Sequence, residues 1–255
     1  MTIEILTLKV LNDNYAYLLL DKTTDQAAVI DPGSAGPVIK ALNNKNLNLS
    51  HILLTHHHYD HSGGVRELKK LYPEAKIAIH EADAAHLTTK CDLKLADGDI
   101  ITFANVAIKI IHLPCHTRGH VAFQVGEALF TGDTLFNAGC GKFFEGTAAE
   151  MLSNLRRLKT LPEMTRIYCG HEYTVENLEY AHQADPDNPE ISNRLDASRT
   201  AQTTNSPLVP STLSLELQTN PFLRLNDEQL QLELKTDNEL DTLTSLYKIY
   251  YGDTP

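Results

Sequence analysis

The sequence lacks several features that would place it in common functional classes. No stretch approaches the uninterrupted apolar length of a membrane span, and no basic segment followed by an apolar run stands at the N-terminus. No basic patch offsets the formal net charge of −11, which argues against binding to nucleic acid or to an anionic membrane. The four cysteines form no CxxC pair, and no G-x-S-x-G motif marks a serine nucleophile. We therefore expect a cytoplasmic protein with reduced, buried cysteines.

Histidine is what the sequence has in excess, with 12 in 255 residues and several of them clustered. The rest of the composition, 42% apolar and 22% charged, is typical of a globular protein that can bury a substantial core. A lone histidine carries little information, whereas a cluster needs a chemical explanation.

The order of expected elements predicts an α/β protein in two parts. Apolar runs and turn residues predict strands at 3–10, 15–20, 27–30, 51–55, 76–80, 106–112, 121–125, 128–131 and 166–169. Helices are expected at 37–46 and 62–72, and a capping box, Thr147 with Glu150, opens another that ends near residue 159. After residue 172 helical patterns dominate, at 175–184, 189–200, near 211–217 and at 239–250. We predict a catalytic domain over 1–172 and a helical substrate-binding domain over 173–255.

The histidine cluster follows the expected strand at 51–55 directly. In an extended segment alternate side chains share a side, so His56, His58 and Asp60 would face one cavity while His57 points away. A helix starting near Asp60 would bring His61 beside it. The plainer alternative is an exposed histidine-rich loop, but a position at a strand end before two glycines is typical of a site.

Three further groups stand in loops just past expected strands. His116 follows the strand at 106–112, Asp133 follows the strand at 128–131, and His171 follows the strand at 166–169. Because loops at one set of strand ends converge in α/β proteins, these residues and the cluster supply seven nitrogen and oxygen donors to one site.

The pattern H-x-H-x-D-H with a later His, Asp and His resembles the signature of the metallo-β-lactamase fold superfamily. Within it, the sequence resembles the glyoxalase II (hydroxyacylglutathione hydrolase) family. The segments that carry this resemblance are 12–15 (NDNY), 31–33 (DPG), 131–136 (TGDTLF), 139–142 (GCGK), 145–147 (EGT), 170–174 (GHEYT), 210–213 (PSTL) and 219–224 (TNPFLR).

The resemblance implies an αββα sandwich with a small helical C-terminal domain and two divalent metal ions, zinc first, with iron or manganese as alternatives. It assigns His56, His58 and His116 to one ion, Asp60, His61 and His171 to the other, and Asp133 to both. Asp60 and Asp133 would also orient the hydroxide that attacks the substrate. The implied reaction, carried out by a monomer in methylglyoxal detoxification, is hydrolysis of a small-molecule thioester, S-2-hydroxyacylglutathione, to a hydroxy acid and a thiol.

The family's substrate-binding positions match only in part. Lys142 and Tyr173 match, whereas Phe144 keeps the ring of a tyrosine and loses its hydroxyl. The basic pair of the C-terminal helix aligns with Tyr247 and Tyr250, with Lys248 adjacent. The missing pair leaves a second carrier open, a glutathione conjugate with a masked carboxylate such as trypanothione.

Other interpretations remain at this stage. Within the fold, a mononuclear-iron persulfide dioxygenase and a β-lactamase or lactonase compete with the thioesterase, and a metal-storage protein is a non-enzymatic alternative. Cys115 and Cys140 are weaker candidates for a nucleophile. Asp31 is either a turn residue or a hydrogen-bond acceptor for a ligand, and His120 could orient His116 or Asp133. The remaining histidines are expected at the surface or in packing: His51, His80, His86, His112 and His182.

Overall fold

The computed structural model describes residues 3–204 and 206–252, and the chain divides into two compact units. Unit 1 comprises Met1–Leu113, Thr117–Gly126 and Phe130–Gly132, and unit 2 comprises Pro114–His116, Glu127–Leu129 and Asp133–Pro255. Among the described residues no helix combines the length and the apolar character needed to cross a membrane.

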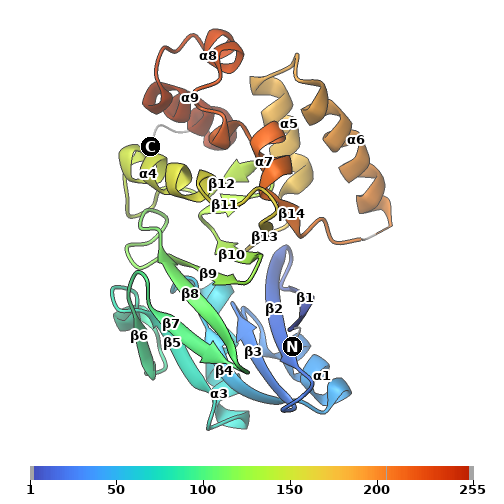
Figure 1. Ribbon diagram of the computed structural model, residues 1–255, viewed down its shortest axis with the longest axis vertical. Coiled ribbons are helices and arrows are strands. Elements are labelled where there is room, and N and C mark those ends of the chain that lie inside the picture. Colours follow the sequence, from blue (N-terminus) through green and yellow to red (C-terminus); the bar gives the residue numbers. More distant parts are fainter. Residues whose placement is uncertain (1–2, 205, 253–255) are drawn as a thin grey trace. The chain divides into compact units, whose positions relative to one another are not determined.

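Unit 1 contains two sheets (Figure 1). The first follows chain order, β1-β2-β3-β4-β5-β6, with antiparallel pairing from β1 to β3 and parallel pairing from β3 to β6. In the second, β10, β9, β8 and β7 are successive neighbours. The elements are β1 (Glu4–Val10), β2 (Asn14–Asp21), β3 (Gln26–Ile30), α1 (Ala35–Lys45), β4 (Asn48–Leu53), α2 (Tyr59–Ser62), α3 (Val65–Leu71), β5 (Lys76–His80), a 3-10 turn (Ala84–His86), β6 (Leu93–Leu95), β7 (Ile100–Phe103), β8 (Val106–His112), β9 (Val121–Val125) and β10 (Ala128–Gly132), which the units share.

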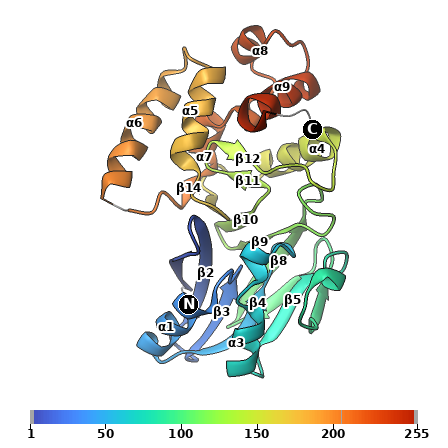
Figure 2. The ribbon, with the colours of Figure 1, turned by 180° about the vertical axis from the view of Figure 1, so that it is seen from behind.

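Helices and a second sheet cover the two faces of the first sheet. Figure 2 shows α1 and α3 on one face, where Val38, Leu42 and Leu68 are fully buried in one apolar cluster with the strands. On the other face, the rings of Tyr17 in β2 and Phe130 in β10 lie 5.2 Å apart. Unit 1 is therefore a sheet-on-sheet sandwich with helices outside, and its strand ends present the loops that carry the candidate ligands.

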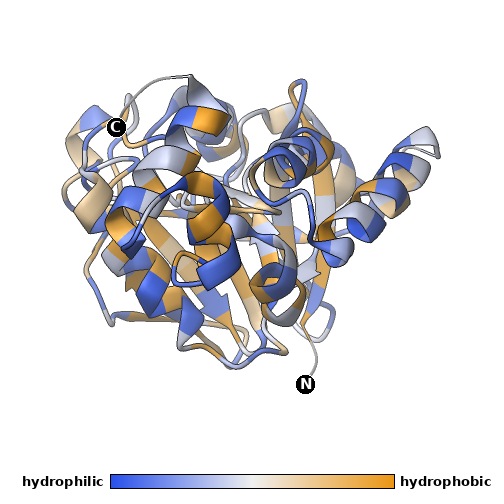
Figure 3. Cartoon of the chain, turned by 90° about the horizontal axis from the view of Figure 1, so that it is seen from above, coloured by the Kyte–Doolittle hydropathy of each residue, from blue (hydrophilic) through white to orange (hydrophobic). Residues whose placement is uncertain are grey.

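Unit 2 is mainly helical. Its elements are β11 (Leu135–Phe136), β12 (Gly139–Cys140), α4 (Ala148–Lys159), β13 (Arg166–Cys169), α5 (Thr174–Ala184), α6 (Pro189–Thr203), β14 (Ser211–Thr212), α7 (Leu213–Thr219), a 3-10 turn (Pro221–Leu223), α8 (Glu228–Leu234) and α9 (Glu239–Tyr251). The predicted capping box opens α4: Thr147 accepts from the Glu150 backbone, and the Glu150 carboxylate accepts from the Thr147 backbone. The ribbons of Figure 3 alternate between hydrophilic and hydrophobic residues along the helices, as amphipathic packing requires.

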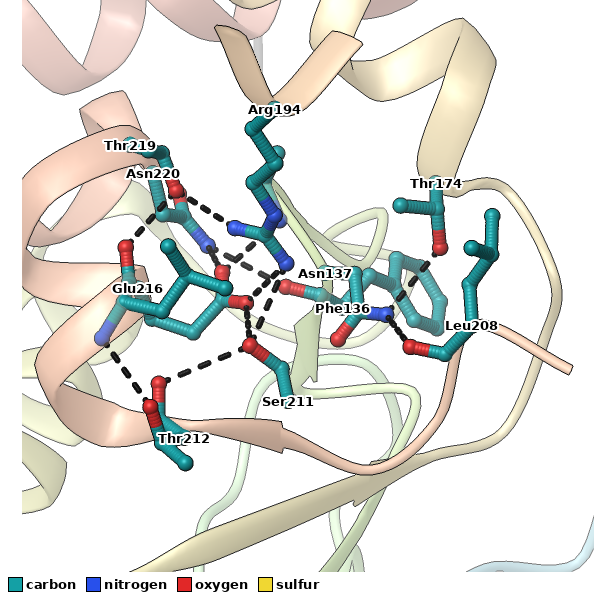
Figure 4. A network of polar contacts seen from close by, with 12 residues as sticks. Phe136, Asn137, Thr174, Arg194, Leu208, Ser211, Thr212, Glu216, Thr219 and Asn220 are labelled. Carbon is teal, nitrogen blue, oxygen red and sulfur yellow. Dashed lines mark hydrogen bonds and ion pairs between the residues drawn. The ribbon is translucent and has the colours of Figure 1, made fainter. Parts of the chain in front are cut away.

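A buried polar network fixes the β11–β12 hairpin of unit 2 (Figure 4). The fully buried carboxylate of Glu216 accepts a hydrogen bond from the Ala138 backbone at 2.8 Å and pairs with Arg194 at 2.5 Å. Asn220 donates to the Gly139 carbonyl at 3.1 Å. Asn220 belongs to the segment 219–224, and Ser211, which donates to Glu216, belongs to the segment 210–213, so both motifs that carried the family resemblance have a structural role in this unit.

The predicted elements are largely confirmed, and the differences have local causes. β5, β8, β9 and β13 have the predicted bounds. The predicted helix at 62–72 begins later, at Val65 in α3, and a separate short helix, α2, precedes it and ends at Ser62. The expectation that strands end near residue 172 was incomplete, since β14 pairs antiparallel with β13. Strands β6 and β7 were missed because their apolar runs are short.

Candidate metal centre

Unit 1 brings its four candidate ligands together at the end of β4. The rings of His56 and His58 lie 4.7 Å apart, and those of His56 and His61 lie 4.1 Å apart. The Nε2 of His61 is 3.4 Å from Oδ2 of Asp60. His56 and His61 are buried, whereas His58 and Asp60 are partly exposed. The four donors therefore line one local site.

One detail of the predicted arrangement was wrong. The extended segment was expected to continue to Asp60, but α2 begins at Tyr59, so Asp60 reaches the site from the first turn of a helix. Tyr59 is 79% exposed. The Nδ1 of His57 lies 2.9 Å from the carboxylate of Asp83, and its ring stacks on His86, with the centroids 4.4 Å apart, and lies 4.9 Å from that of His58.

Asp31 orients His61. It follows β3 with a φ of +51°, and its Oδ2 lies 3.1 Å from Nδ1 of His61. The same carboxylate accepts from the backbone and the hydroxyl of Thr55, at 2.8 and 2.6 Å. Engaging Nδ1 fixes the imidazole so that Nε2 is the atom available for a metal. Asp31 is therefore both a turn residue and the acceptor for a candidate ligand.

Two other side chains support this part of the site. Asn14 donates from Nδ2 to Oδ2 of Asp60 at 2.9 Å, which restrains the carboxylate. The His120 ring is fully buried and stacks on His56 with the centroids 5.0 Å apart. Asn14 belongs to a motif recognised in the sequence, but its contact with Asp60 was not foreseen.

Unit 2 brings its three candidate ligands together around one oxygen. Oδ2 of Asp133 lies 3.5 Å from Nε2 of His116 and 3.3 Å from Nε2 of His171. All three residues are buried. His116 is oriented by the backbone, since its Nδ1 lies 2.9 Å from the Lys142 carbonyl oxygen.

The spacings within each unit fit a metal ion. Two donors each about 2.1 Å from one ion, at a tetrahedral angle, stand about 3.4 Å apart. The pairs His61–Asp60, His116–Asp133 and His171–Asp133 are separated by 3.4, 3.5 and 3.3 Å. Imidazole nitrogens with carboxylate oxygens form a donor set suited to zinc, iron or manganese.

The candidate substrate residues of unit 2 gather around the segment that follows Asp133. The ammonium of Lys142 lies 5.1 Å above the ring of Tyr251, a residue that the sequence analysis missed. The Tyr251 hydroxyl donates to the carbonyl of Cys140. Phe144 is 63% exposed, and its ring centroid is 5.1 Å from that of His116. Lys142, whose carbonyl orients His116, and Phe144, whose ring lies beside His116, therefore belong to one short segment next to this candidate ligand.

The remaining candidate substrate residues, Tyr173 and, in α9, Tyr247, Lys248 and Tyr250, differ in their burial and contacts. Tyr250 is buried, and its hydroxyl donates to the carbonyls of Ala138 and Asn177. Tyr247 is also buried, and its hydroxyl accepts from the Phe143 backbone at 3.4 Å. Lys248 is exposed. Tyr173 stacks on His171 with the ring centroids 4.8 Å apart.

Burial keeps the nearby thiols and phenols protonated. Burial raises the pKa of the Cys140 thiol well above its usual range, with a smaller contribution from Cys115, and raises the pKa of Cys169 to about 12. A thiol that stays protonated at neutral pH is a poor nucleophile, which argues against Cys140 in that role. Burial also raises the pKa of Tyr250, in keeping with the bonds that its hydroxyl donates.

Comparison with known proteins decides the family. The sequence model of the Metallo-beta-lactamase superfamily matches residues 11–171, and that of the Hydroxyacylglutathione hydrolase C-terminus matches residues 172–249. A Pelagibacter ubique protein named hydroxyacylglutathione hydrolase is 45% identical over 228 residues, covering 89% of this chain and 95% of the relative. The chain belongs to the hydroxyacylglutathione hydrolase family. The predicted family and superfamily are therefore confirmed.

Another relative agrees with this placement, and solved structures show the fold. The Arabidopsis thaliana protein named "Hydroxyacylglutathione hydrolase cytoplasmic" is 42% identical over 241 residues, covering 91% of this chain and 92% of the relative. The crystal structure of ETHE1 from Myxococcus xanthus matches with a TM-score of 0.70 at 21% identity, covering 100% of this chain and 92% of that one. TTHA1623 in a di-iron-bound form matches with a TM-score of 0.61 at 28% identity, covering 87% and 100% of the two chains. The predicted metallo-β-lactamase fold with a helical C-terminal region is confirmed.

Proposed function

We propose that this member of the hydroxyacylglutathione hydrolase family hydrolyses S-2-hydroxyacylglutathione thioesters, of the S-lactoylglutathione type, with the help of two metal ions. The observation that carries the proposal is the shared oxygen of Asp133, 3.5 Å from Nε2 of His116 and 3.3 Å from Nε2 of His171. One carboxylate oxygen beside two imidazoles is the arrangement that a bridging ligand needs. The names of the Arabidopsis and Pelagibacter relatives, both hydroxyacylglutathione hydrolases, support the substrate.

The proposed centre divides seven ligands between two ions. One ion is assigned to His56, His58 and His116, the other to Asp60, His61 and His171, and Asp133 to both. When bound, such a pair of ions brings the pKa of a shared water close to neutrality and polarises the substrate carbonyl. Zinc is the proposed metal, with iron or manganese as alternatives, because nitrogen and oxygen donors discriminate poorly among them. The di-iron form of TTHA1623 supports a dinuclear centre rather than a particular metal.

The protein's own residues have defined tasks in this scheme. Asp31 and the Lys142 carbonyl hold His61 and His116 by their Nδ1 atoms, so both rings present Nε2. A thioester suits such a site because its leaving group, a thiol of pKa about 8.5, departs as a thiolate without a strong general acid. No serine, cysteine or general acid needs to be added to this set.

Binding of the thiol carrier is assigned to unit 2. The Lys142 ammonium would pair with a carboxylate of glutathione, and Tyr173 and Phe144 would provide ring surfaces beside the ligands His171 and His116. In α9, Tyr247, Lys248 and Tyr250 stay candidates, although the hydroxyls of both tyrosines already bind backbone groups. We place residues 173–255 in a substrate-binding domain, and the enzyme in the cytoplasm as a monomer, with the name of the Arabidopsis relative supporting that compartment.

Thiol release from S-lactoylglutathione tests this function. The metal-stripped protein should be inactive, and activity should return with added zinc, in proportion to metal bound up to two ions per chain. Oxygen uptake without thiol release would contradict the thioesterase and point to a dioxygenase. A strong preference for lactoyltrypanothione would leave the chemistry standing and overturn glutathione as the carrier.

A further inference from the structure

A buried carboxylate outside the ligand set, Asp83, joins two loops of unit 1. It follows β5 and is 1% exposed. Its Oδ2 accepts a hydrogen bond from the backbone of His57 at 3.0 Å and one from the hydroxyl of Thr117 at 2.8 Å. Its Oδ1 accepts from the backbone of Gly119 at 2.7 Å. One carboxylate therefore bonds both the histidine-cluster loop and the loop between β8 and β9.

The residues that Asp83 binds are neighbours of candidate ligands in the chain. His57 stands between His56 and His58, and its Nδ1 is 2.9 Å from Oδ2 of Asp83. Thr117, which is fully buried, directly follows His116. His56, His58 and His116 are the three histidines that the proposed function assigns to a single ion.

Gly119 packs closely against the carboxylate of Asp83. A Cβ added at Gly119 would lie 2.4 Å from Oδ1 of Asp83, so the loop can approach the carboxylate only with glycine there. The three bonded donors, two backbone N–H groups and a hydroxyl, all point at acceptor-only oxygens. Replacing such an acceptor within a buried set leaves donors without a partner, which displaces the loops or costs stability.

We propose that Asp83 is a positioning residue that sets the geometry of the ion held by His56, His58 and His116, and that it has little influence on the ion held by Asp60, His61 and His171. It acts through the backbone of His57 and through Thr117 and touches neither substrate nor metal. The inference rests on the proposed two-ion centre. Groups that orient metal ligands in this indirect way typically contribute 10- to 100-fold in metal affinity or activity.

Cobalt(II) titration against a competing chelator tests the inference, with the visible absorption of the bound ions as the readout. In Asp83→Asn, one of the two cobalt ions should bind 10- to 100-fold more weakly. The NH2 of the new amide would face the N–H or O–H donors of the two loops, so at least one of these hydrogen bonds is lost. The other ion should be retained as in the unchanged protein. Equal weakening of both ions, or no weakening of either, would overturn the inference.

Two further variants distinguish the proposed role of Asp83 from a general folding defect. Thr117→Val keeps the side-chain shape and removes one of the three hydrogen bonds, so it should weaken the same ion by a smaller factor. Asp92→Asn is the matched control: Asp92 accepts from the backbone of Ile77 in the same sheet at 2.9 Å, away from the ligand loops, and its loss should leave both ions in place. If the unchanged protein binds fewer than two ions, the two-ion centre fails. If the unchanged protein binds two ions, and both variants bind them with unchanged affinity, the two-ion centre stands and only the proposed role of Asp83 fails.

Discussion

The two groups of candidate ligands are built in different ways. In unit 1 four donors come from residues 56–61, and side chains from other segments orient two of them, Asp31 at His61 and Asn14 at Asp60. In unit 2 three donors are spread from residue 116 to residue 171, and His116 is oriented by a backbone carbonyl. The first group is therefore a local motif supported by side chains, whereas the second depends on how a long segment folds.

The segment after Asp133 shows what that dependence involves. Glu216 and Asn220 bind the β11–β12 hairpin, and the hydroxyl of Tyr250 donates to the Ala138 carbonyl at its tip. Residues 78 to 112 positions away thus set the path of the chain between Asp133 and Lys142. A substitution of Asp31 is therefore expected to act through one ligand, His61, whereas one that loosens the β11–β12 hairpin is expected to act through a whole segment.

The largest effect is expected for Asp133→Asn. The amide has one acceptor oxygen and no charge, so it cannot serve both His116 and His171 as a bridging carboxylate would. Turnover should be abolished and both metal ions should be retained more weakly, as measured by thioester hydrolysis and by metal analysis after gel filtration. An active variant with two ions would show that Asp133 does not bridge.

A smaller loss is expected for Asp31→Asn in unit 1. The variant loses the charged acceptor at Nδ1 of His61, so activity at fixed metal concentration should fall by about 10- to 100-fold. Added metal should restore part of it, because the ligand itself remains. Asp21→Asn is the control, since Asp21 accepts bonds within its own turn, from Thr23 and Thr24. Equal losses in the two variants would contradict an orienting role.

In unit 2, Lys142→Ala should raise KM about tenfold while changing kcat less, because it removes binding shared by the ground and transition states.

Tyr251→Leu removes the ring beneath the ammonium and should raise KM by a few-fold, in line with a cation–π contribution of about 0.5–1 kcal/mol. The steady-state kinetics of the double variant supply the check: its KM should equal that of Lys142→Ala. If the two effects instead multiply, Tyr251 acts independently of Lys142.

The smallest effect concerns acid stability. Burial lowers the pKa of His80 below 6.5, as does the stacked His112, while Asp83, Glu81 and Asp97 oppose the shift. The folded state therefore binds the proton less readily than the unfolded state, and the contribution to stability is present above pH 6.5 and lost as pH falls below it. The protection of unit 1 amides against hydrogen exchange, measured relative to their intrinsic exchange rates, should fall between pH 7 and 5, and less so in His80→Gln. An unchanged pH dependence in the variant would exclude His80 as a cause.

Much of the fold was predictable because local patterns were strong. The capping box at Thr147 and the apolar strands of unit 1 were identified from spacing alone. Strands β11, β12 and β14 have only two residues each, and they are held by a distant side chain, Asn220, or by pairing with β13, so no local pattern could indicate them. Helix α8 was also missed, although its N-cap, Asp227, is an ordinary helix-start signal.

The site was predictable to the extent that its residues form motifs. The ligands of unit 1 follow from one hexapeptide, and Asp31 was already a candidate acceptor. Asp83 and Tyr251 had no signal, because their roles come from contacts with Thr117 and Lys142 at separations of 34 and 109 residues. The helix start at Tyr59 also changed how Asp60 reaches the site.

The central claim is that the two groups of ligands hold one pair of ions in common. The most direct measurement is electron paramagnetic resonance of the manganese(II)-loaded protein. Two ions sharing Asp133, roughly 3.5–4 Å apart, should give the spectrum of a spin-coupled pair at two manganese ions per chain. A single bound ion, or two ions with uncoupled spectra, would contradict the account.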